Sequence, residues 1–359
     1  MNIAMNERMM TGALTFEKIK YLLLLDDKAD IAKLIEKARQ KRDTTIGNKV
    51  YLRGLIEFSN RCAKNCLYCG IRASNSNVER YTVSDDDVIE AAMFALKNKY
   101  GSIVLQSGER SDREFTSHIS SLLQKIHEAT GHNLRITLSC GEQSEEVYRE
   151  WFRLGAQRYL LRIEASNPEL YKKIHPDNEN HSYNRRLRSL KTLIDSGFQT
   201  GTGVMIGLPF QTIDDLINDL IFIRDSGVVM VGMGPYVEHA ETPLYEHRGK
   251  LLPAEKRVEL TLKMIAILRL MRPTINIAST TALQTLDENG RELGLRAGAN
   301  VIMPNITPVL YKKEYDLYEG KPALHDEPDE VGEAIEKLIT NVGCQVGWSE
   351  WGDSKFYSN

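Results

Sequence analysis

The sequence has few cysteines and no long hydrophobic run, and both shortages narrow the possible classes of protein. Its 359 residues include only five cysteines, an odd number that does not suit the disulfide framework of a small secreted domain. The longest apolar stretches, such as residues 22–25, fall far short of the roughly 20 residues that a membrane-spanning helix needs. The N-terminus lacks a basic region followed by an apolar core. We therefore expect a cytoplasmic protein that does not engage a membrane.

The sequence also lacks a strong charge of either sign. Its 46 Lys and Arg residues and 49 Asp and Glu residues leave a formal net charge of −3. A surface that binds nucleic acid would need a basic patch or stripe, so we expect no nucleic-acid partner. With 42% hydrophobic and 26% charged residues, the chain has the composition of a globular protein, and a small-molecule substrate is favoured.

Short apolar or β-branched runs alternate with amphipathic segments of helical length through most of the chain. This alternation is typical of a parallel sheet whose strands are connected by helices. We predict eight strands, at residues 51–59, 102–106, 135–139, 158–164, 200–208, 228–234, 275–280 and 300–303. Eight is the closure number of a (β/α)8 barrel of the TIM type, so we predict that α/β fold.

The segments outside the predicted barrel are short. Residues 16–42 carry apolar side chains at helical spacing among many charges, which predicts one or two amphipathic helices. No composition shift marks a linker. We therefore expect three parts: an N-terminal helical extension at residues 1–48, the barrel at residues 49–322, and a C-terminal extension at residues 323–359 that packs on the barrel.

Three of the five cysteines lie close together, because Cys62, Cys66 and Cys69 form a CxxxCxxC motif directly after the first predicted strand. That position is the carboxyl end of the barrel, where barrel enzymes build their active sites. Three thiolates can bind three irons of a 4Fe–4S cluster and leave the fourth iron open. A structural zinc ion is the alternative, but it needs four ligands. Cys140 and Cys344 stand alone, and we expect a buried small residue and a surface thiol, respectively.

Charged residues recur at alternate positions in two predicted strands. Arg53 and Glu57 share one face of the first strand, and Arg158, Arg162 and Glu164 share one face of the fourth. Alternate side chains of a barrel strand point into the lumen, where an unpaired charge is costly. The alternative is that these charges lie at strand ends, in water or in structural ion pairs. As a set they favour a polar chamber for a substrate with anionic groups.

Several further motifs occur in a fixed order around the cysteines. Tyr68 precedes the last cysteine of the motif, Ser107, Gly108 and Glu109 end the second strand, and Met205 and Gly207 lie at the end of the fifth. In this order the motifs resemble the radical SAM superfamily. The resemblance implies that S-adenosylmethionine binds the open iron, that Tyr68 and the two later segments contact this cofactor, and that electron transfer releases a 5′-deoxyadenosyl radical.

Longer segments resemble one family within that superfamily, the HydE-type maturases of FeFe-hydrogenase. The matching segments between about residues 50 and 322 are IEFSN (56–60), LQSGE (105–109), RYLLR (158–162), IGLP (206–209), GMGP (232–235), TPL (242–244), GANVIMPN (298–305) and YDLY (315–318). The resemblance implies that Glu164 and Arg186 hold the methionine part of S-adenosylmethionine. It also implies a substrate chamber lined by Arg53, Gln106, Thr137, Arg158, Arg162, Met230, Thr280, Thr281, Met303, Tyr315 and Tyr318.

The resemblance implies a reaction and partners as well. Enzymes of this family are understood to act on an iron–cysteine complex with carbonyl and cyanide ligands, which a tyrosine-cleaving HydG-like maturase delivers. A HydF-like maturase and an electron donor complete the expected partners. Some relatives carry a second Fe–S cluster on three cysteines that Ala323, Val331 and Ala334 replace here, so we expect one cluster and not two.

Other activities stay open at this point. The same barrel could serve a methylornithine-synthase-like mutase acting on an amino-acid-like substrate, or a paralogue unrelated to hydrogenase. Sulfur insertion of the biotin-synthase type is disfavoured because it needs a second cluster. A non-catalytic Fe–S carrier is disfavoured because it has no use for Glu164, Arg186 and the Ser-Gly-Glu segment.

Overall fold

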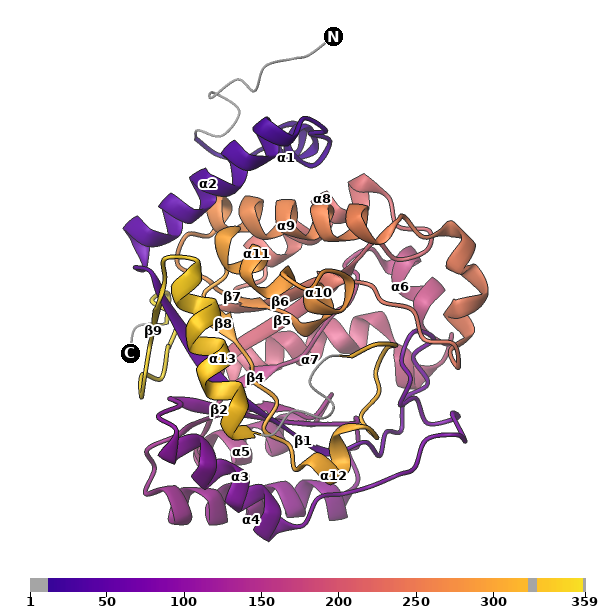
Figure 1. Ribbon diagram of the computed structural model, residues 1–359. Coiled ribbons are helices and arrows are strands. Elements are labelled where there is room, and N and C mark those ends of the chain that lie inside the picture. Colours follow the sequence, from indigo (N-terminus) through magenta and orange to yellow (C-terminus); the bar gives the residue numbers. More distant parts are fainter. Residues whose placement is uncertain (1–11, 322–327, 358–359) are drawn as a thin grey trace.

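Parallel strands follow one another in chain order around a closed barrel in the computed structural model, which describes residues 12–321 and 328–357 (Figure 1). The strands are β1 (Lys49–Ser59), β2 (Ser102–Ser107), β3 (Arg135–Ser139), β4 (Ala156–Leu160), β5 (Gln199–Ile206), β6 (Met230–Pro235), β7 (Asn276–Ser279) and β8 (Val301–Ile302). Because β1 pairs in parallel with both β2 and β8, the sheet closes on itself. The predicted (β/α)8 barrel is confirmed.

Helices surround the strands, and most of them begin at a side-chain cap. They are α3 (Asp85–Lys97), α4 (Arg113–Thr130), α5 (Glu145–Arg153), α6 (Pro168–Ile174), α7 (Tyr183–Asp195), α8 (Ile213–Asp225), α9 (Ala254–Met271), α10 (Thr281–Leu286) and α11 (Gly290–Arg296). Ser84, Asp112 and Ser144 each accept a hydrogen bond from the backbone N–H three residues later, which satisfies a donor that the first helical turn leaves unpaired. Such caps fix where each helix starts after its strand.

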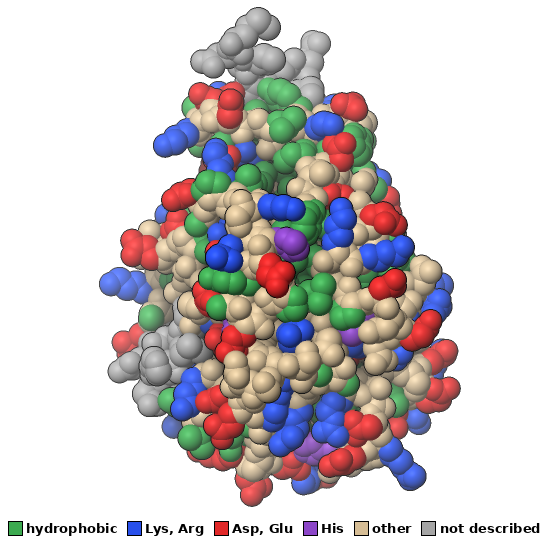
Figure 2. Space-filling model, turned by 90° about the vertical axis from the view of Figure 1, so that its right-hand side faces the viewer, with side chains coloured by type: hydrophobic (Ala, Val, Ile, Leu, Met, Phe, Trp, Pro, Cys, Tyr) green, Lys and Arg blue, Asp and Glu red, His purple; other side chains and the backbone are tan. Residues whose placement is uncertain are grey.

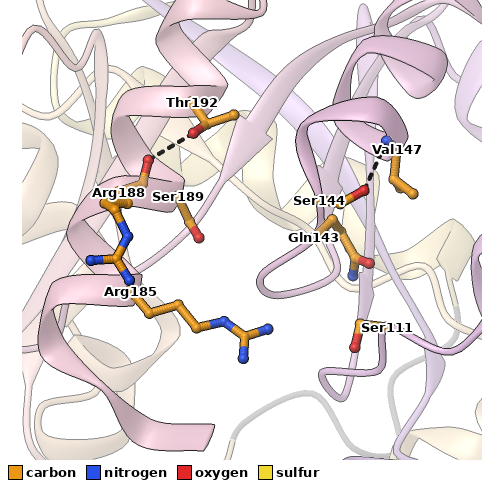
Figure 3. Close-up of a pocket in the computed structure, with 8 residues that line it drawn as sticks. All are labelled: Ser111, Gln143, Ser144, Val147, Arg185, Arg188, Ser189 and Thr192. Carbon is orange, nitrogen blue, oxygen red and sulfur yellow. Dashed lines mark hydrogen bonds between the residues drawn. The ribbon is translucent and has the colours of Figure 1, made fainter. Parts of the chain in front are cut away.

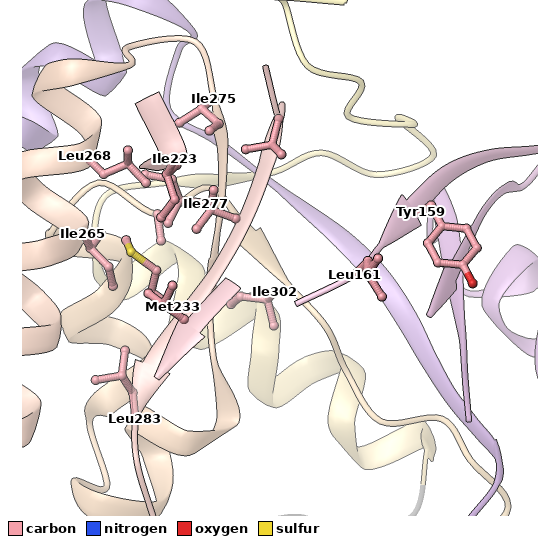
Figure 4. Packing of buried hydrophobic residues seen from close by; sticks show 14 of the residues in the cluster. Tyr159, Leu161, Ile223, Met233, Ile265, Leu268, Ile275, Ile277, Leu283 and Ile302 are labelled. Atoms are coloured by element: carbon pink, nitrogen blue, oxygen red, sulfur yellow. The ribbon is translucent and has the colours of Figure 1, made fainter. Parts of the chain in front are cut away.

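The apolar core fills the space between the barrel and its helices. Figure 4 shows Met233 of β6 and Ile277 of β7 packed beside Ile265 and Leu268 of α9, and all four side chains are fully buried. Burial of this layer is the main favourable term that holds the helices on the sheet. Within the described parts of the chain, no helix is both long and apolar enough to span a membrane.

Two N-terminal helices cover one side of the barrel, as predicted. They are α1 (Phe16–Leu23) and α2 (Lys28–Thr45), and both pack against α9. The guanidinium of Arg42 is buried and donates to the backbone oxygens of Leu295 at 2.7 Å and Ala299 at 3.1 Å. These bonds attach α2 to the end of α11.

The C-terminal segment crosses the amino ends of the strands, which form the floor of the barrel. Helix α13 (Pro328–Asn341) leads into β9 (Gln345–Val346), which pairs with the first residues of β1. Gly101 permits the close approach of the following tail, since a Cβ there would lie 1.8 Å from the backbone oxygen of Glu350. Cys140 is buried as predicted, but the prediction for Cys344 is wrong, because it is only 4% exposed where this segment packs on the core.

The fourth strand ends earlier than the sequence pattern predicts. It stops at Leu160, whereas the prediction extended it to Glu164. Beyond Leu160 the regular ladder with β5 is interrupted, because the hydroxyl of Thr202 rather than a carbonyl accepts the N–H of Ile163 at 3.2 Å. Glu164 then adopts a positive φ of 64°. Arg162 and Glu164 therefore lie in an irregular segment above the strand, where Glu164 forms only an isolated bridge with Val204 of β5.

Candidate active site at the mouth of the barrel

The cysteine loop leaves the carboxyl end of β1 and is attached to three neighbouring segments. The backbone N–H of Ala63 donates to Glu109 at 2.8 Å, that of Leu67 to Ile174 at 3.0 Å, and that of Gly70 to Leu317 at 3.1 Å. The three cysteines on this loop are half-buried. Figure 2 views this side of the molecule, where acidic and basic side chains are mixed.

The three thiols suit a cationic cluster. Burial raises the pKa of Cys62, Cys66 and Cys69, and for Cys66, whose pKa rises to about 12, repulsion from the Cys62 thiolate adds to the effect. Iron bound between thiolates would remove that repulsion and favour their deprotonated form. The N–H groups of Lys64 and Glu109 also lie 3.4 and 3.3 Å from the Cys62 sulfur. The residues present therefore fit the predicted 4Fe–4S cluster.

Arg80 forms hydrogen bonds with both ends of the cysteine loop. The sequence pattern did not predict this role for Arg80. Its guanidinium donates to the backbone oxygens of Asn60 at 2.8 Å, Ile71 at 2.7 Å, Arg72 at 2.6 Å and Asn75 at 3.2 Å. Asn60 precedes the first cysteine and the other three follow the last. One side chain thus fixes the span of the loop, and lysine could not reproduce this planar array of donors.

Two acidic and two basic side chains form a buried network beside the loop. Arg186 contacts Glu109 at 3.1 Å and Glu142 at 2.6 Å, and Lys64 contacts the same carboxylates at 3.0 and 3.2 Å. Burial works to raise the pKa of Glu142, but the two cations outweigh it, so the pKa is lowered. Glu109 and Arg186 were predicted to contact the cofactor, whereas Lys64 and Glu142 were missed because no motif marks them.

Arg162 and Glu164 form a second ion pair at the mouth, in which the carboxylate is buried and the Arg162 side chain is 31% exposed. The guanidinium donates to both oxygens of Glu164, at 2.6 and 2.8 Å, and to the backbone oxygen of Gly232 at 2.7 Å. Gly203 makes room for this guanidinium, since a Cβ there would lie 2.7 Å from its Nη1. The positive φ of Glu164 is strained for a residue with a side chain, and such strain concentrates at functional sites. Arg162, predicted for the substrate chamber, thus lies beside Glu164, predicted for the cofactor.

The remaining predicted cofactor residues lie around the same mouth. The Tyr68 hydroxyl is 3.4 Å from Nε2 of His175, and Tyr68 and Met205 pack against a small apolar cluster that is separate from the main core. Met205 also donates its N–H to the backbone oxygen of Glu164 at 3.0 Å. Gly207 follows with a positive φ of 82°. Met205 therefore lies directly beside the Arg162–Glu164 pair.

Gly108 allows the second predicted cofactor segment to approach the cysteine loop. A Cβ at Gly108 would lie 2.4 Å from the backbone oxygen of Arg61 and 2.8 Å from Cβ of Cys62. The adjacent Ser107 donates its hydroxyl to the Gly108 oxygen at 2.8 Å. The glycine is therefore required for close contact between the ends of β1 and β2.

The upper lumen holds a buried carboxylate and the predicted tyrosines. Glu57 contacts Lys321 at 2.5 Å and accepts a hydrogen bond from Asn305 at 2.9 Å. Lys321 also donates to the backbone oxygen of Tyr315 at 2.9 Å, and burial raises the pKa of Tyr315 while a hydrogen bond with Gln106 opposes the rise. No pattern in the sequence marks Lys321 and Asn305 as partners of Glu57.

Other predicted chamber residues lie near these groups, at the ends of β6, β7 and β8. The hydroxyls of Thr281 and Tyr318 are 2.7 Å apart, and Thr280 donates to the backbone oxygen of Met233 at 3.4 Å. Met303, which follows β8, is half-buried. Hydroxyl groups therefore dominate this part of the upper lumen.

The lower lumen contains two fully buried arginines that contact the C-terminal tail. Arg158 pairs with Asp353 at 2.5 Å, and Arg53 donates to the sulfur of Met230 at 2.8 Å and to the backbone oxygen of Gly352 at 3.3 Å. Among the described residues, Nε and Nη1 of Arg158, Nε of Arg53 and the hydroxyl of Thr137 have no hydrogen-bond partner. Buried donors of this kind are normally satisfied, so they suit a polar ligand in the lumen.

Comparisons with known proteins agree with this geometry. The radical SAM superfamily model matches residues 56–223. The chain is 41% identical over 350 residues to the FeFe hydrogenase maturase subunit HydE of Thermotoga maritima, covering 97% of this chain and 96% of the relative. It is 27% identical over 296 residues to 3-methylornithine synthase of Methanosarcina barkeri, covering 82% and 80%. The crystal structure of methylornithine synthase (PylB) has a TM-score of 0.80 and 22% identity, covering 96% of this chain and 97% of that chain, which shows a shared fold.

Proposed function

Because this chain belongs to the radical SAM superfamily, and within it to the family of the FeFe hydrogenase maturase HydE, we propose that it helps assemble the active-site cluster of an FeFe-hydrogenase. The family implies a 4Fe–4S cluster and S-adenosylmethionine. The observation that carries the proposal is the loop of three half-buried thiols beside two networks of carboxylates and guanidinium groups. When bound, the cluster and S-adenosylmethionine supply a 5′-deoxyadenosyl radical.

The residues at the mouth would hold these cofactors. Cys62, Cys66 and Cys69 would bind one cluster, and we propose no second one. The Glu164 carboxylate can accept hydrogen bonds from an amino group, and Arg186 can bind a carboxylate. Together they suit the two charged ends of an amino acid such as the methionine part of S-adenosylmethionine. Further contacts with this cofactor are proposed for Tyr68, Ser107, Gly108, Glu109, Met205 and Gly207.

The lumen below the mouth would hold the substrate, for which we propose the iron–cysteine complex with carbonyl and cyanide ligands. The unpartnered donors of Arg158, Arg53 and Thr137 can bind anionic or polar ligand groups. The tail across the floor and the helices around the barrel would exclude water from a radical reaction. The full set proposed to face substrate is Arg53, Gln106, Thr137, Arg158, Arg162, Met230, Thr280, Thr281, Met303, Tyr315 and Tyr318.

This function needs three partners: a HydG-like maturase, a HydF-like maturase and an electron donor.

Anaerobic reconstitution should give about four irons per chain, and S-adenosylmethionine with dithionite should yield 5′-deoxyadenosine. The decisive assay adds the chain to the two partner maturases and an inactive FeFe-hydrogenase and measures hydrogen evolution. Release of 5′-deoxyadenosine without hydrogenase activation, together with conversion of lysine to methylornithine, would favour the mutase instead.

A further inference from the structure

The backbone around Glu164 forms a strained turn of three residues. Glu164 has a positive φ of 64°, and the N–H of Ala165 donates across it to the backbone oxygen of Ile163 at 2.8 Å. We call residues 163–165 the glutamate turn. A three-residue turn with a positive φ at its centre is rare and strained, and it persists only where the surrounding structure fixes it. The contacts on either side of the glutamate turn therefore decide where the Glu164 carboxylate lies.

Strand β5 fixes the backbone of Glu164 itself. The N–H of Glu164 donates to the oxygen of Gly203 at 2.9 Å, and the oxygen of Glu164 accepts the N–H of Met205 at 3.0 Å. These two bonds form the isolated bridge between Glu164 and Val204. They do not fix the exit of the glutamate turn, where the chain leaves the sheet toward α6.

The exit of the turn is held by Asp219, a buried residue on α8 that no sequence motif marks. Its Oδ1 accepts the N–H of Ser166 at 2.7 Å. On the other side, Tyr183 of α7 donates its hydroxyl to the backbone oxygen of Ser166. Both Asp219 and Ser166 are buried, so loss of the carboxyl group would leave a buried N–H without this partner. Ser166 is thus fixed from two helices.

The burial of Asp219 is unfavourable for folding. Burial raises the pKa of Asp219 to about 7, although contact with Ser166 opposes the rise, and repulsion from Asp215 and Glu164 adds to it. Oδ2 of Asp219 has no hydrogen-bond partner among the described residues. An apolar side chain would pack α8 on the barrel without the cost of burying a carboxyl group. Packing of α8 therefore does not account for an acidic residue at this position.

From these contacts we infer that Asp219 is a positioning residue, which fixes Glu164 for the cofactor by holding Ser166 at the exit of the glutamate turn. The inference rests on the proposed function, in which Glu164 binds the methionine part of S-adenosylmethionine. Asp219 acts through the backbone of Ser166 and needs no contact with the cofactor. Without it, the Ser166 N–H would need another partner, and the turn could relax to a less strained φ that moves the Glu164 carboxylate.

The test measures the dissociation constant of the reconstituted chain for S-adenosylmethionine. Asp219→Leu removes the acceptor and should weaken binding about tenfold. Asp219→Asn keeps an oxygen for the Ser166 N–H and should bind within about threefold of the wild type. Iron content should stay at about four per chain in both variants, because Asp219 lies outside the cysteine loop. Asp219→Ala, which also lacks the acceptor, repeats the measurement if leucine does not fit.

The matched control for these variants is Leu220→Ala. Leu220 is the next residue on α8 and is fully buried in the main core. The substitution creates a cavity, so it should lower the midpoint of urea unfolding. Its dissociation constant for S-adenosylmethionine should nevertheless stay within about twofold of the wild type, because Leu220 does not hold the glutamate turn.

The second contact of Ser166 should have a smaller effect. Tyr183→Phe removes only the hydroxyl that donates to the Ser166 oxygen, and it should weaken cofactor binding about threefold. Its control on α7 is Arg188→Ala. Arg188 is exposed and lines a hollow of about 390 Å³, where Figure 3 shows it with Arg185 on one side and Ser144 on the other. This control should bind S-adenosylmethionine as the wild type does.

A double-mutant cycle separates a positioning role from a general loss of structure. If Asp219 acts through Glu164, Asp219→Leu should weaken binding no further in a chain that already carries Glu164→Gln. Full addition of the two effects would overturn the inference, as would unchanged binding in Asp219→Leu or equal weakening in Leu220→Ala. Absence of 5′-deoxyadenosine from the wild type with dithionite, or unchanged cofactor binding in Glu164→Gln alone, would instead refute the proposed function.

Discussion

Paired arginines lie at both ends of the barrel, but their charges are neutralised in different ways. At the mouth, Arg162 pairs with Glu164 only two residues away, and Arg186 pairs with carboxylates on neighbouring loops. On the floor, Arg158 pairs with Asp353, which is 195 residues away in the sequence. At the mouth, both partners of each ion pair therefore belong to the barrel. On the floor, the ion pair of Arg158 forms only when the C-terminal tail is in place.

The two ends also differ in how many arginine donors the protein uses. Arg162 donates to both oxygens of Glu164 and to the backbone oxygens of Gly232 and Val204. Arg158 leaves Nε and Nη1 without a partner among the described residues. A guanidinium that spends most of its donors within the protein suits a positioning role, and a buried one with unused donors suits ligand binding. The difference supports our proposal that Arg158 faces substrate, whereas the bonds of Arg162 add a second proposed role for that residue, the positioning of Glu164.

The largest effect on iron content and activity should come from a substitution at the mouth, Cys66→Ala. Removing one of three proposed ligands leaves too few thiolates for a stable cluster, so the iron content should fall from about four per chain to near zero. Formation of 5′-deoxyadenosine should stop as well. Cys140→Ala is the matched control, because that thiol is fully buried in the main core and is not part of the cysteine loop. It should retain its iron, and cofactor cleavage by Cys66→Ala would refute the cluster assignment.

Two substitutions should show that the mouth binds the cofactor and that the floor acts on the substrate. Glu164→Gln keeps the shape of the side chain but removes its charge, and should weaken S-adenosylmethionine binding by about tenfold or more. Arg158→Met should leave that dissociation constant within about twofold while abolishing hydrogenase activation. Equilibrium binding and the activation assay measure the two effects. If Arg158→Met weakened cofactor binding as much as Glu164→Gln, the two ends would not have separate roles.

The mouth was easier to predict from the sequence than the floor, for a physical reason. The cysteine motif and the strand pattern are local, so their spacing places the loop after β1 without knowledge of distant contacts. Asp353 could not be identified, because its pairing with Arg158 depends on the path of the tail. Arg80 was missed because its partners are backbone oxygens, which leave no pattern in the sequence. The early end of β4 depends on the hydroxyl of Thr202, which alternation alone cannot show.

A moderate effect on stability is expected from a substitution on the floor, Asp353→Asn. Burial works to raise the pKa of Asp353, but Arg158, Gln199 and Arg135 outweigh it, so the pKa lies below its ordinary value of 3.8. Because the folded pKa is the lower one, the ion pair stabilises the fold above that ordinary value, and the stabilisation is lost as the pH falls through the folded pKa. At pH 7 the substitution should reduce the free energy of unfolding by about 2 kcal/mol, the contribution typical of a hydrogen bond to a charged group.

Urea unfolding at several pH values checks this expectation. The gap between Asp353→Asn and the wild type should be full at pH 7 and should narrow as the pH falls below about 4, where the wild-type carboxylate becomes protonated. Iron content and S-adenosylmethionine binding should not change, because the mouth does not depend on the tail. A gap that persists unchanged at low pH would show that packing of the tail, rather than the charge of Asp353, accounts for the lost stability.

The smallest effect should come from the surface of the same tail, in Glu350→Ala. Glu350 pairs with Lys49 at 2.5 Å, but the two side chains are 42% and 45% exposed, and exposed pairs contribute only about 0.2–1 kcal/mol. The tail is held instead by buried bonds from Arg158, Arg53 and Asn276. The midpoint of urea unfolding should therefore shift far less than in Asp353→Asn, and the small shift should disappear in high salt. A loss of stability as large as that of Asp353→Asn would mean that surface charge holds the tail. The floor would then not be closed by buried contacts, and the comparison with the mouth would fail.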